Sequence, residues 1–390
     1  MIRVGFVFLF HDGWLGGINY YRNLLTAIYA MPDRKIEAVI FTGLKTPAKR
    51  FADFPPVTIV RSRLFDRGSL PWLMRKVWQR IFLHDIFLER LLKKHSIAVL
   101  SHSGWLGKKA DIPAIGWIPD FQHVRLPEFF DAKEVAIRNE YFSGLCRYCS
   151  AVIVSSFDAL DDLRRFDPSG QSKAKVLQFV VAATKAQEIL PSRQALEEKY
   201  HFQGKYFLLP NQFWKHKNHQ VVIEALGLLV EERRQVLVLA TGNTQDHRHP
   251  KYFEVLMTRA RVLGVAKLFC PLGLVPADDL AALMVHSSAI INPSYFEGWS
   301  TTVEEAKSLG KPVLLSDIPV HREQNPPWGN YFQPDNVKAL AAMLWETWNK
   351  PTSDEVGNVA TAQRVMDERR LEFAKQYQDI VFDVVEGQSR

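Results

Sequence analysis

Two glutamates, Glu297 and Glu305, stand eight positions apart in a stretch that joins a loop to a helix. The apolar run ending at Asn292 predicts a strand, and residues 302–309 predict a helix. One carboxylate then lies in the loop and the other on the helix, so both can face one ligand. Carboxylates accept paired hydrogen bonds from neighbouring hydroxyl groups, as in a sugar or a ribose. Alternatively, Glu305 only favours the helix dipole while Glu304 faces solvent, and the spacing alone leaves both interpretations open.

A second stretch whose side chains could bind a ligand is the basic loop at 211–219, which follows a predicted strand at 206–209. The ammonium groups of Lys215 and Lys217 can stabilise negative charge such as that of a phosphate. Taken by itself, a cluster of basic and imidazole side chains this dense is typical of a solvated loop. The loop becomes a binding candidate only when another feature points to a phosphate beside it.

Further candidates follow strands predicted in the first half of the chain. Asp120 and His123 come after the strand at 114–118, where a carboxylate and an imidazole can bind a ligand. A single loop histidine is more often structural, but the place at a strand end favours the functional interpretation. Gly16 and Gly17 follow the first strand and lead into a helix, whose amino end suits a phosphate. An ordinary turn explains this glycine pair equally well, since the spacing is not that of a dinucleotide fingerprint.

The elements that must position these residues alternate between strands and helices. Short runs rich in Val, Ile and Leu predict strands that are covered on both faces, as in parallel sheets. They stand at 4–9, 38–42, 57–60, 98–101, 114–118 and 151–155, and again at 206–209, 236–240, 268–271, 289–292 and 313–316. The pattern predicts an α/β protein with two Rossmann-like, doubly wound domains facing a central cleft. The expected domains are 1–183 and 184–364, with a final helix at 365–390 that returns to the first domain.

The segment 292–305 resembles the signature of glycosyltransferase family 4, a family of retaining enzymes with the GT-B fold. The hallmark is a glutamate, seven intervening residues and a second glutamate, then a small-residue helix, a glycine and a strand. Glu297, Glu305 and Gly310 match it, and the resemblance is dense over residues 206–335 and sparse before them. It implies that a hexose moves from a nucleotide diphosphate sugar, GDP-mannose or a UDP-sugar, to an acceptor with retention. It also implies that no metal or other cofactor takes part.

The resemblance assigns roles to individual residues, with the first domain taking the acceptor and the second the donor. The implied catalytic residues are Glu297, Lys217, His123 and Asp120. The implied donor-nucleotide residues are Glu305, Gly16, Gly17, Gln212, Lys215, Gly298, Ser300, Thr301 and Thr302. Three positions depart from the family pattern: Gln212 stands where an arginine is usual, Pro119 where a histidine is usual, and Ser300 where a glycine is common. Lys215 and His123 are the residues that could compensate for the first two departures.

Residues 70–95 combine aromatic and basic side chains within one predicted helix. Trp72, Trp78, Phe82 and Phe87 alternate with six arginines and lysines: Arg75, Lys76, Arg80, Arg90, Lys93 and Lys94. A basic, aromatic helix can rest on anionic lipid, which would favour a lipid-linked acceptor in surface polysaccharide or lipopolysaccharide synthesis. An amphipathic helix that packs its apolar side on the sheet explains the pattern equally well. The acceptor is therefore expected to be a glycan or a lipid-linked glycan.

Composition narrows the remaining classes of function. The 390 residues carry a formal net charge of +7, which favours acidic partners, but no nucleic-acid-binding module accompanies it. Three cysteines without a completing Cys or His pair predict neither a zinc site nor a disulfide framework. The sequence shows no export signal and no apolar stretch that could span a membrane. We expect a cytoplasmic protein, peripheral on the inner face of the cell membrane if residues 70–95 bind lipid.

Three other functions compete with sugar transfer. A nucleotide-sugar epimerase or hydrolase of GT-B fold would use the same donor site but release free sugar and nucleotide without an acceptor. A non-catalytic sugar-binding protein of the periplasmic type would need an export signal. An NAD-dependent oxidoreductase would need the glycine fingerprint that the loop at 13–17 does not have.

Overall fold

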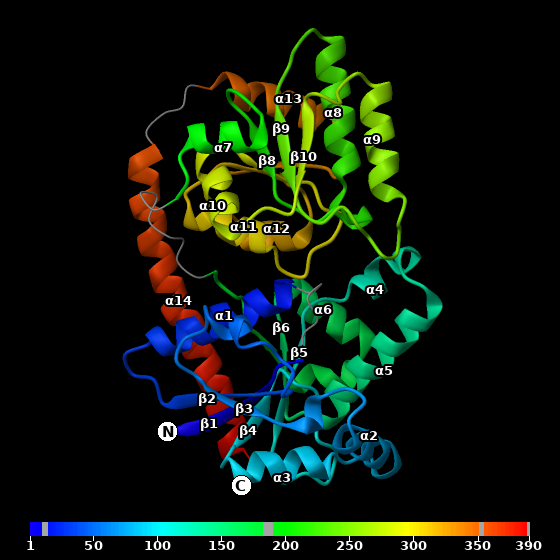
Figure 1. Ribbon diagram of the computed structural model, residues 1–390, viewed down its shortest axis with the longest axis vertical. Coiled ribbons are helices and arrows are strands. Elements are labelled where there is room, and N and C mark those ends of the chain that lie inside the picture. Colours follow the sequence, from blue (N-terminus) through cyan, green and yellow to red (C-terminus); the bar gives the residue numbers. More distant parts are fainter. Residues whose placement is uncertain (10–14, 182–189, 351–354, 388–390) are drawn as a thin grey trace. The chain divides into compact units, whose positions relative to one another are not determined.

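The structure is a computed structural model and describes residues 1–9, 15–181, 190–350 and 355–387 (Figure 1). Contacts divide the chain into two compact units. The first unit comprises Met1–Phe121, Ala132–Ala182 and Glu368–Arg390, and the second comprises Gln122–Asp131 and Ala183–Asp367. The boundary expected between residues 183 and 184 falls outside the described residues. None of the described helices is long and apolar enough to span a membrane.

The first unit is built on a sheet whose paired strands are all parallel. Its described strands, in order of pairing, are β3 (Thr58–Arg61), β2 (Ile36–Thr42), β1 (Ile2–Val7), β4 (Val99–Ser101), β5 (Ala114–Ile118), β6 (Ala151–Val154) and β7 (Ala174–Val176). Its helices are α1 (Leu15–Ala30), α2 (Leu70–Phe82), α3 (Ile86–Lys94), α5 (Ala132–Tyr148), α6 (Phe157–Phe166) and the last part of α14 (Glu355–Glu386). The strand order reverses beside β1, as in doubly wound folds.

Successive residues of β1 point to opposite faces of this sheet, and both faces are covered. Phe6 packs against Tyr21 of α1 and Tyr377 of α14, with ring centroids 5.9 and 6.3 Å apart. Val7 lies in a separate core with side chains of α3, α5 and α6. The hydroxyl of Tyr377 donates to Ser101 Oγ of β4 at 2.9 Å, so the end of α14 is part of the first unit.

The second unit repeats the arrangement with a parallel sheet of its own. Its described strands, in order of pairing, are β10 (Phe269–Gly273), β9 (Val238–Thr241), β8 (Phe207–Leu209), β11 (Ile290–Asn292), β12 (Val313–Ser316) and β13 (Gly329–Phe332). Its helices are α4 (Gln122–Arg125), α7 (Arg193–Tyr200), α8 (His219–Glu231), α9 (Tyr252–Val262), α10 (Ala277–His286), α11 (Thr301–Ser308), α12 (Pro319–Gln324) and α13 (Val337–Asn349). Phe207 and Leu209 pack with α8, α9 and α13, whereas Leu208 packs with α7, α10 and α11. The predicted doubly wound α/β fold is confirmed.

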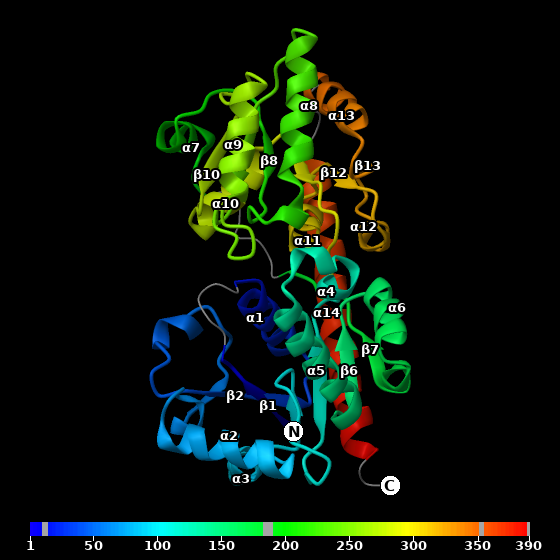
Figure 2. The ribbon, with the colours of Figure 1, turned by 90° about the vertical axis from the view of Figure 1, so that its right-hand side faces the viewer.

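The single helix predicted over residues 70–95 is wrong, because the structure contains two helices there. Helix α2 ends before Leu83, whose left-handed φ of 51° breaks the helical path. Asp85 then starts α3, and its side chain accepts a hydrogen bond from the Leu88 amide at 3.1 Å. Figure 2 shows α2 and α3 side by side in the first unit.

Candidate functional site

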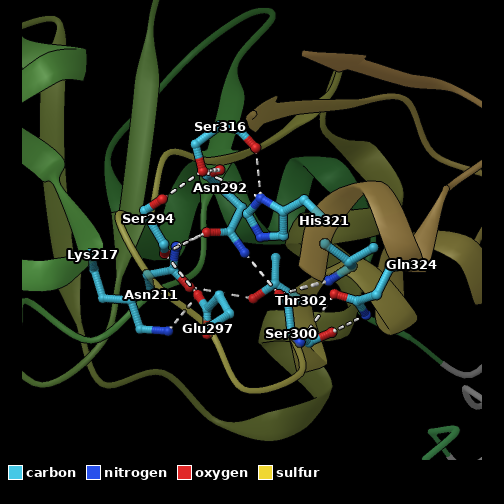
Figure 3. Close-up of polar contacts among 11 residues, drawn as sticks. Asn211, Lys217, Asn292, Ser294, Glu297, Ser300, Thr302, Ser316, His321 and Gln324 are labelled. Atoms are coloured by element: carbon cyan, nitrogen blue, oxygen red, sulfur yellow. Dashed lines mark hydrogen bonds and ion pairs between the residues drawn. The ribbon is translucent and has the colours of Figure 1, made fainter. Parts of the chain in front are cut away.

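The strand order of the second unit reverses between β8 and β11, which lie next to each other. In open parallel sheets, ligands bind at the carboxyl ends of the strands, in the crevice between the loops that follow the two strands at such a reversal. Lys217 stands in the loop after β8, and Glu297 stands in the loop after β11. Lys217 Nζ lies 2.6 Å from Glu297 Oε1, and both side chains are largely buried (Figure 3). The fold therefore brings a cation and a carboxylate from distant parts of the chain to the place where a ligand is expected.

Local backbone structure holds these two loops together. Residues Lys215–Lys217 form a short 3-10 helix that ends at Asn218, which adopts a left-handed φ of 53°. The amide of the Asn218 side chain donates to the carbonyl of Pro293 at 3.2 Å. In addition, the Tyr295 amide donates to the carbonyl of His216 at 2.8 Å. These bonds fix the position of Lys217 relative to the loop that carries Glu297.

The electrostatics of Glu297 favour its ionised form. Burial by itself raises the pKa of this carboxyl, but Lys217 and His321 lower it more, so the pKa lies below its ordinary value. Ser294 Oγ also donates a hydrogen bond to Glu297 Oε1 at 2.7 Å. Glu297 is thus a buried carboxylate with a cation and a hydroxyl already in place.

A buried polar network adjoins this pair and fixes the start of α11 (Figure 3). The side-chain oxygen of Asn292 accepts from the Asn211 side-chain amide at 3.2 Å and lies 2.7 Å from Ser294 Oγ. The amide nitrogen of Asn292 donates to Ser300 Oγ at 2.7 Å. That hydroxyl in turn accepts from the Val303 amide at 3.3 Å and caps the helix. The last residue of β11 thereby positions the helix that carries Glu305.

Helix α12 locks the same helix start from the other side. Gln324 accepts the Ser300 amide at 3.1 Å and donates to the Ser300 carbonyl at 3.0 Å. The same Gln324 nitrogen donates to the carboxylate of Glu304 at 3.1 Å. Glu304 is fully buried, so the interpretation in which it faces solvent is wrong. The Ser300 N–H, carbonyl and hydroxyl all have partners within the protein.

His321 lies in this network with a defined orientation. Its Nδ1 is 2.9 Å from the Ser316 carbonyl oxygen, which accepts only from a protonated nitrogen. The other ring nitrogen, Nε2, is buried and has no hydrogen-bond partner among the described residues. Burial lowers the pKa of His321 in spite of the nearby Glu297 carboxylate. The contact with the Ser316 carbonyl therefore places a proton on Nδ1 of His321.

The remaining candidates of the second unit surround this centre. Thr302 is buried and donates to Asn211 at 3.4 Å, and Glu305, Thr301 and Gly298 are partly exposed. Gln212 lies in the β8 loop, where its side-chain oxygen accepts from the Asn243 amide at 2.7 Å. Lys215 is exposed, and its ammonium lies 5.0 Å from the centre of the Phe129 ring. His123 is buried in α4, within the segment Gln122–Asp131 that packs with the second unit.

Three candidates belong to the first unit instead. Asp120 follows β5 and is partly exposed. Gly16 and Gly17 lie in the first turn of α1, where helix amides have no partner within the helix. The preceding residues 10–14, which include Gly13 of the predicted glycine loop, lie outside the described residues. Among the described residues, no three His, Cys, Asp or Glu side chains are grouped so that they could hold a metal ion.

Sequence reasoning did not select Asn211, Asn292, Ser294, Gln324 or His321. Asn292 and Ser316 are the last residues of β11 and β12, so a polar residue ending an apolar strand was the available signal. Gln324 gave no such signal, because its partners Ser300 and Glu304 are more than fifteen residues away in sequence.

Comparison with known proteins gives a family match for the part of the chain that carries this site. Residues 192–356 match the family model described as Glycosyl transferases group 1. The O-antigen chain mannosyltransferase B of Escherichia coli is 31% identical over 106 residues, which are 27% of this chain and 26% of that protein. The match thus spans about a quarter of the length of this curated relative.

Solved structures extend the similarity to nearly the whole fold. HepE of Anabaena, solved in complex with UDP and glucose, is 16% identical with a TM-score of 0.67, covering 98% of this chain and 100% of that one. WaaG, a glycosyltransferase involved in lipopolysaccharide biosynthesis, is 17% identical with a TM-score of 0.60 and covers 98% of each chain. The resemblance predicted from Glu297 and Glu305 is confirmed: residues 192–356 form a group 1 glycosyl transferase domain in a chain of GT-B fold.

Proposed function

We propose that this protein transfers a hexose from a nucleotide diphosphate sugar to a glycan or lipid-linked acceptor, with retention and without a divalent metal. The observation that carries the proposal is the buried Lys217–Glu297 pair, with its 2.6 Å contact beyond the reversal of the second sheet. A cation and a carboxylate in one site match a donor that presents both a diphosphate and sugar hydroxyls.

The two charged groups have separate tasks in this mechanism. As the sugar bond breaks, negative charge builds on the departing diphosphate, and a fixed cation stabilises it most when water is excluded. Lys217 supplies that cation, and Glu297 accepts hydrogen bonds from the donor sugar. Glu305, on α11, accepts from the ribose hydroxyls. Glu297 also keeps Lys217 in place before the donor arrives, so little rearrangement is needed at the reacting centre.

Both units supply the other candidates. The amino end of α1, with Gly16 and Gly17, offers backbone amides to the diphosphate. Asp120 and His123 act on the acceptor side, and Lys215 offsets the loss of the arginine that Gln212 replaces. Together with the relatives, these residues favour a role in surface polysaccharide synthesis on the cytoplasmic side of the cell membrane. GDP-mannose and UDP-glucose are the first donors to test, since the similar proteins include a mannosyltransferase and HepE with UDP and glucose.

The test has two stages. A thermal-shift screen of GDP-, UDP-, dTDP- and ADP-sugars identifies the donor, because a ligand at 100 times its dissociation constant stabilises by about 2.7 kcal/mol. Sugar transfer to glycan and lipid-linked acceptors is then followed by mass spectrometry, with the new anomeric configuration read by NMR. Glu297→Gln is expected to abolish transfer, whereas Glu346→Gln, an exposed glutamate of α13, leaves it unchanged.

Each outcome separates the competing functions. Acceptor-independent release of free sugar and nucleotide would favour the epimerase or hydrolase. Binding without turnover by any acceptor would favour a sugar-binding protein. Transfer is expected to continue in excess EDTA, and a complete loss that magnesium or manganese restores would remove the metal-free mechanism.

A further inference from the structure

Helix α2 presents its apolar side to solvent. Leu70, Val77 and Ile81 are 70%, 57% and 65% exposed, and they recur at helical spacing along the whole length of α2. The exposed apolar residues of α2, together with the residue that follows it, are Leu70, Leu73, Met74, Val77, Trp78, Ile81, Phe82 and Leu83. Amphipathic helices of water-soluble proteins normally turn this side towards the core. A continuous exposed apolar stripe of this kind marks an interaction surface.

The orientation of α2 is fixed by its polar side. Arg75 is the one buried residue of this helix, and its Nε donates to the buried carboxylate of Asp85 at 2.7 Å. The Arg75 guanidinium also lies 5.2 Å from the centre of the Phe65 ring. Because a helix turns 100° per residue, residues two and six positions after Arg75 point away from it. An ion pair therefore anchors α2 to the first unit with its apolar stripe outward.

The exposed charges within the segment 61–94 are of one sign, although the exposed Asp111 outside it pairs with Lys93. The exposed charged residues between 61 and 94 are all basic: Arg61, Arg63, Arg67, Lys76, Arg80, Arg90, Lys93 and Lys94. The three acids of this segment, Asp66, Asp85 and Glu89, are buried. On the helical projection, Lys76 and Arg80 follow one border of the apolar stripe. An apolar stripe with a cationic border is complementary to a surface that is anionic outside and apolar just beneath.

We propose that the exposed stripe of α2 docks the protein on an anionic lipid bilayer. The helix lies in the plane of the interface, with Val77 and Ile81 below the headgroups and with Lys76 and Arg80 against them. Such docking would hold the first unit beside a lipid-linked acceptor, and in that respect it rests on the proposed function. The donor site lies in the second unit, so binding to lipid and binding to nucleotide can be measured independently.

Vesicle co-sedimentation of the full chain tests the proposal. Vesicles of phosphatidylglycerol and phosphatidylcholine are compared with vesicles of phosphatidylcholine alone. Wild type is expected to bind the anionic vesicles, and added salt should weaken binding because it screens surface charge. Lys76→Gln with Arg80→Gln should weaken binding about 30-fold, taking the usual contribution of each basic residue near such a surface. Val77→Ser with Ile81→Ser should reduce it at least as much.

The matched control is Val255→Ser with Val262→Ser, which changes two apolar residues of α9 that are 59% and 71% exposed. This control should bind vesicles as wild type does, and all variants should keep the wild-type thermal shift with the donor nucleotide sugar. Arg75 is unsuitable as a test, since its loss would leave Asp85 buried without its cation.

Equal vesicle binding by wild type and the Val77/Ile81 variant would overturn the proposal. So would a wild-type dimer in solution that these substitutions dissociate, because the stripe would then be an interface between two copies. If wild type did not bind nucleotide sugars, this result would count against the proposed donor site alone. The vesicle result would still stand.

Discussion

At the scale of single residues, substitution of Glu297 and substitution of Glu305 should impair different steps. Glu305 is expected to accept from the ribose, so Glu305→Ala should weaken nucleoside diphosphate binding by about 1.5–3 kcal/mol, as for hydrogen bonds to charged groups. Glu297→Ala should reduce transfer much more than it reduces nucleotide affinity. Calorimetry with the free nucleotide and a transfer assay measure the two effects, with Glu346→Ala as the exposed control. Unchanged nucleotide affinity in Glu305→Ala would contradict this division of roles.

The lowered pKa of Glu297 also predicts how stability depends on pH. A carboxyl whose pKa is lower in the folded state stabilises the fold above its unfolded pKa, about 4.3, and loses this contribution as pH falls through the folded value. Glu297→Gln removes that contribution, so its stability deficit at pH 7 should shrink as the pH is lowered below about 4. Urea unfolding at pH 7, 5, 4 and 3.5 measures this, and Glu346→Gln should show no such trend. A stability deficit that stays constant with pH would mean that Lys217 does not lower the pKa of the Glu297 carboxyl in the folded protein.

At the scale of elements, the start of α11 depends on the side chain of Gln324. Gln324→Leu leaves the Ser300 amide and carbonyl and the Glu304 carboxylate without this partner. A buried polar group without a partner costs about 1–3 kcal/mol, so the second unit should be destabilised by at least that amount. Thermal unfolding measures the loss, and Gln194→Leu, an exposed residue of α7, is the control. A change as small as in the control would mean that Ser300 holds the helix start alone.

The elements also show how far the sequence could be interpreted. Strands β5 and β12 have their predicted bounds, and every residue of both strands is buried. Strands β7 and β13 lie at sheet edges and are only partly buried, so they carry too weak an apolar pattern to predict. Which side of α2 faces inward depends on the Arg75–Asp85 pair across a helix break, and periodicity alone cannot give it.

The candidate site divides in the same way. Lys217 and Glu297 were selected by motif, and the strand order explains why they meet, since β8 and β11 are neighbours although 80 residues separate the two side chains. Only the alternative interpretation of Glu305 places Glu304 at the surface, because that interpretation rests on helix position alone. Its burial follows from α12, a neighbour that is close in space but distant in sequence.

At the scale of the whole molecule, the chain crosses between its units more than once. Helix α14 follows the second unit in sequence, yet residues from Glu368 onward pack with the first. Phe373, Tyr377 and Val381 are buried there, and Gln378 accepts the Lys35 amide at 2.7 Å. The first unit is therefore complete only after the last helix has been made.

This order of assembly gives the last prediction. Phe373→Ala should cost about 3–5 kcal/mol through the cavity it leaves in the first unit, although it lies beyond the donor domain in sequence. Hydrogen exchange read by mass spectrometry should show faster exchange in β1 and β4, while β8 and β11 keep their protection, because each sheet has its own core. Leu340→Ala, in the core beneath α13, should give the reverse pattern at a cost of about 2–5 kcal/mol. If Phe373→Ala exposed β8 and β11 to the same extent as β1 and β4, the two units would unfold as one, and α14 would couple their stabilities.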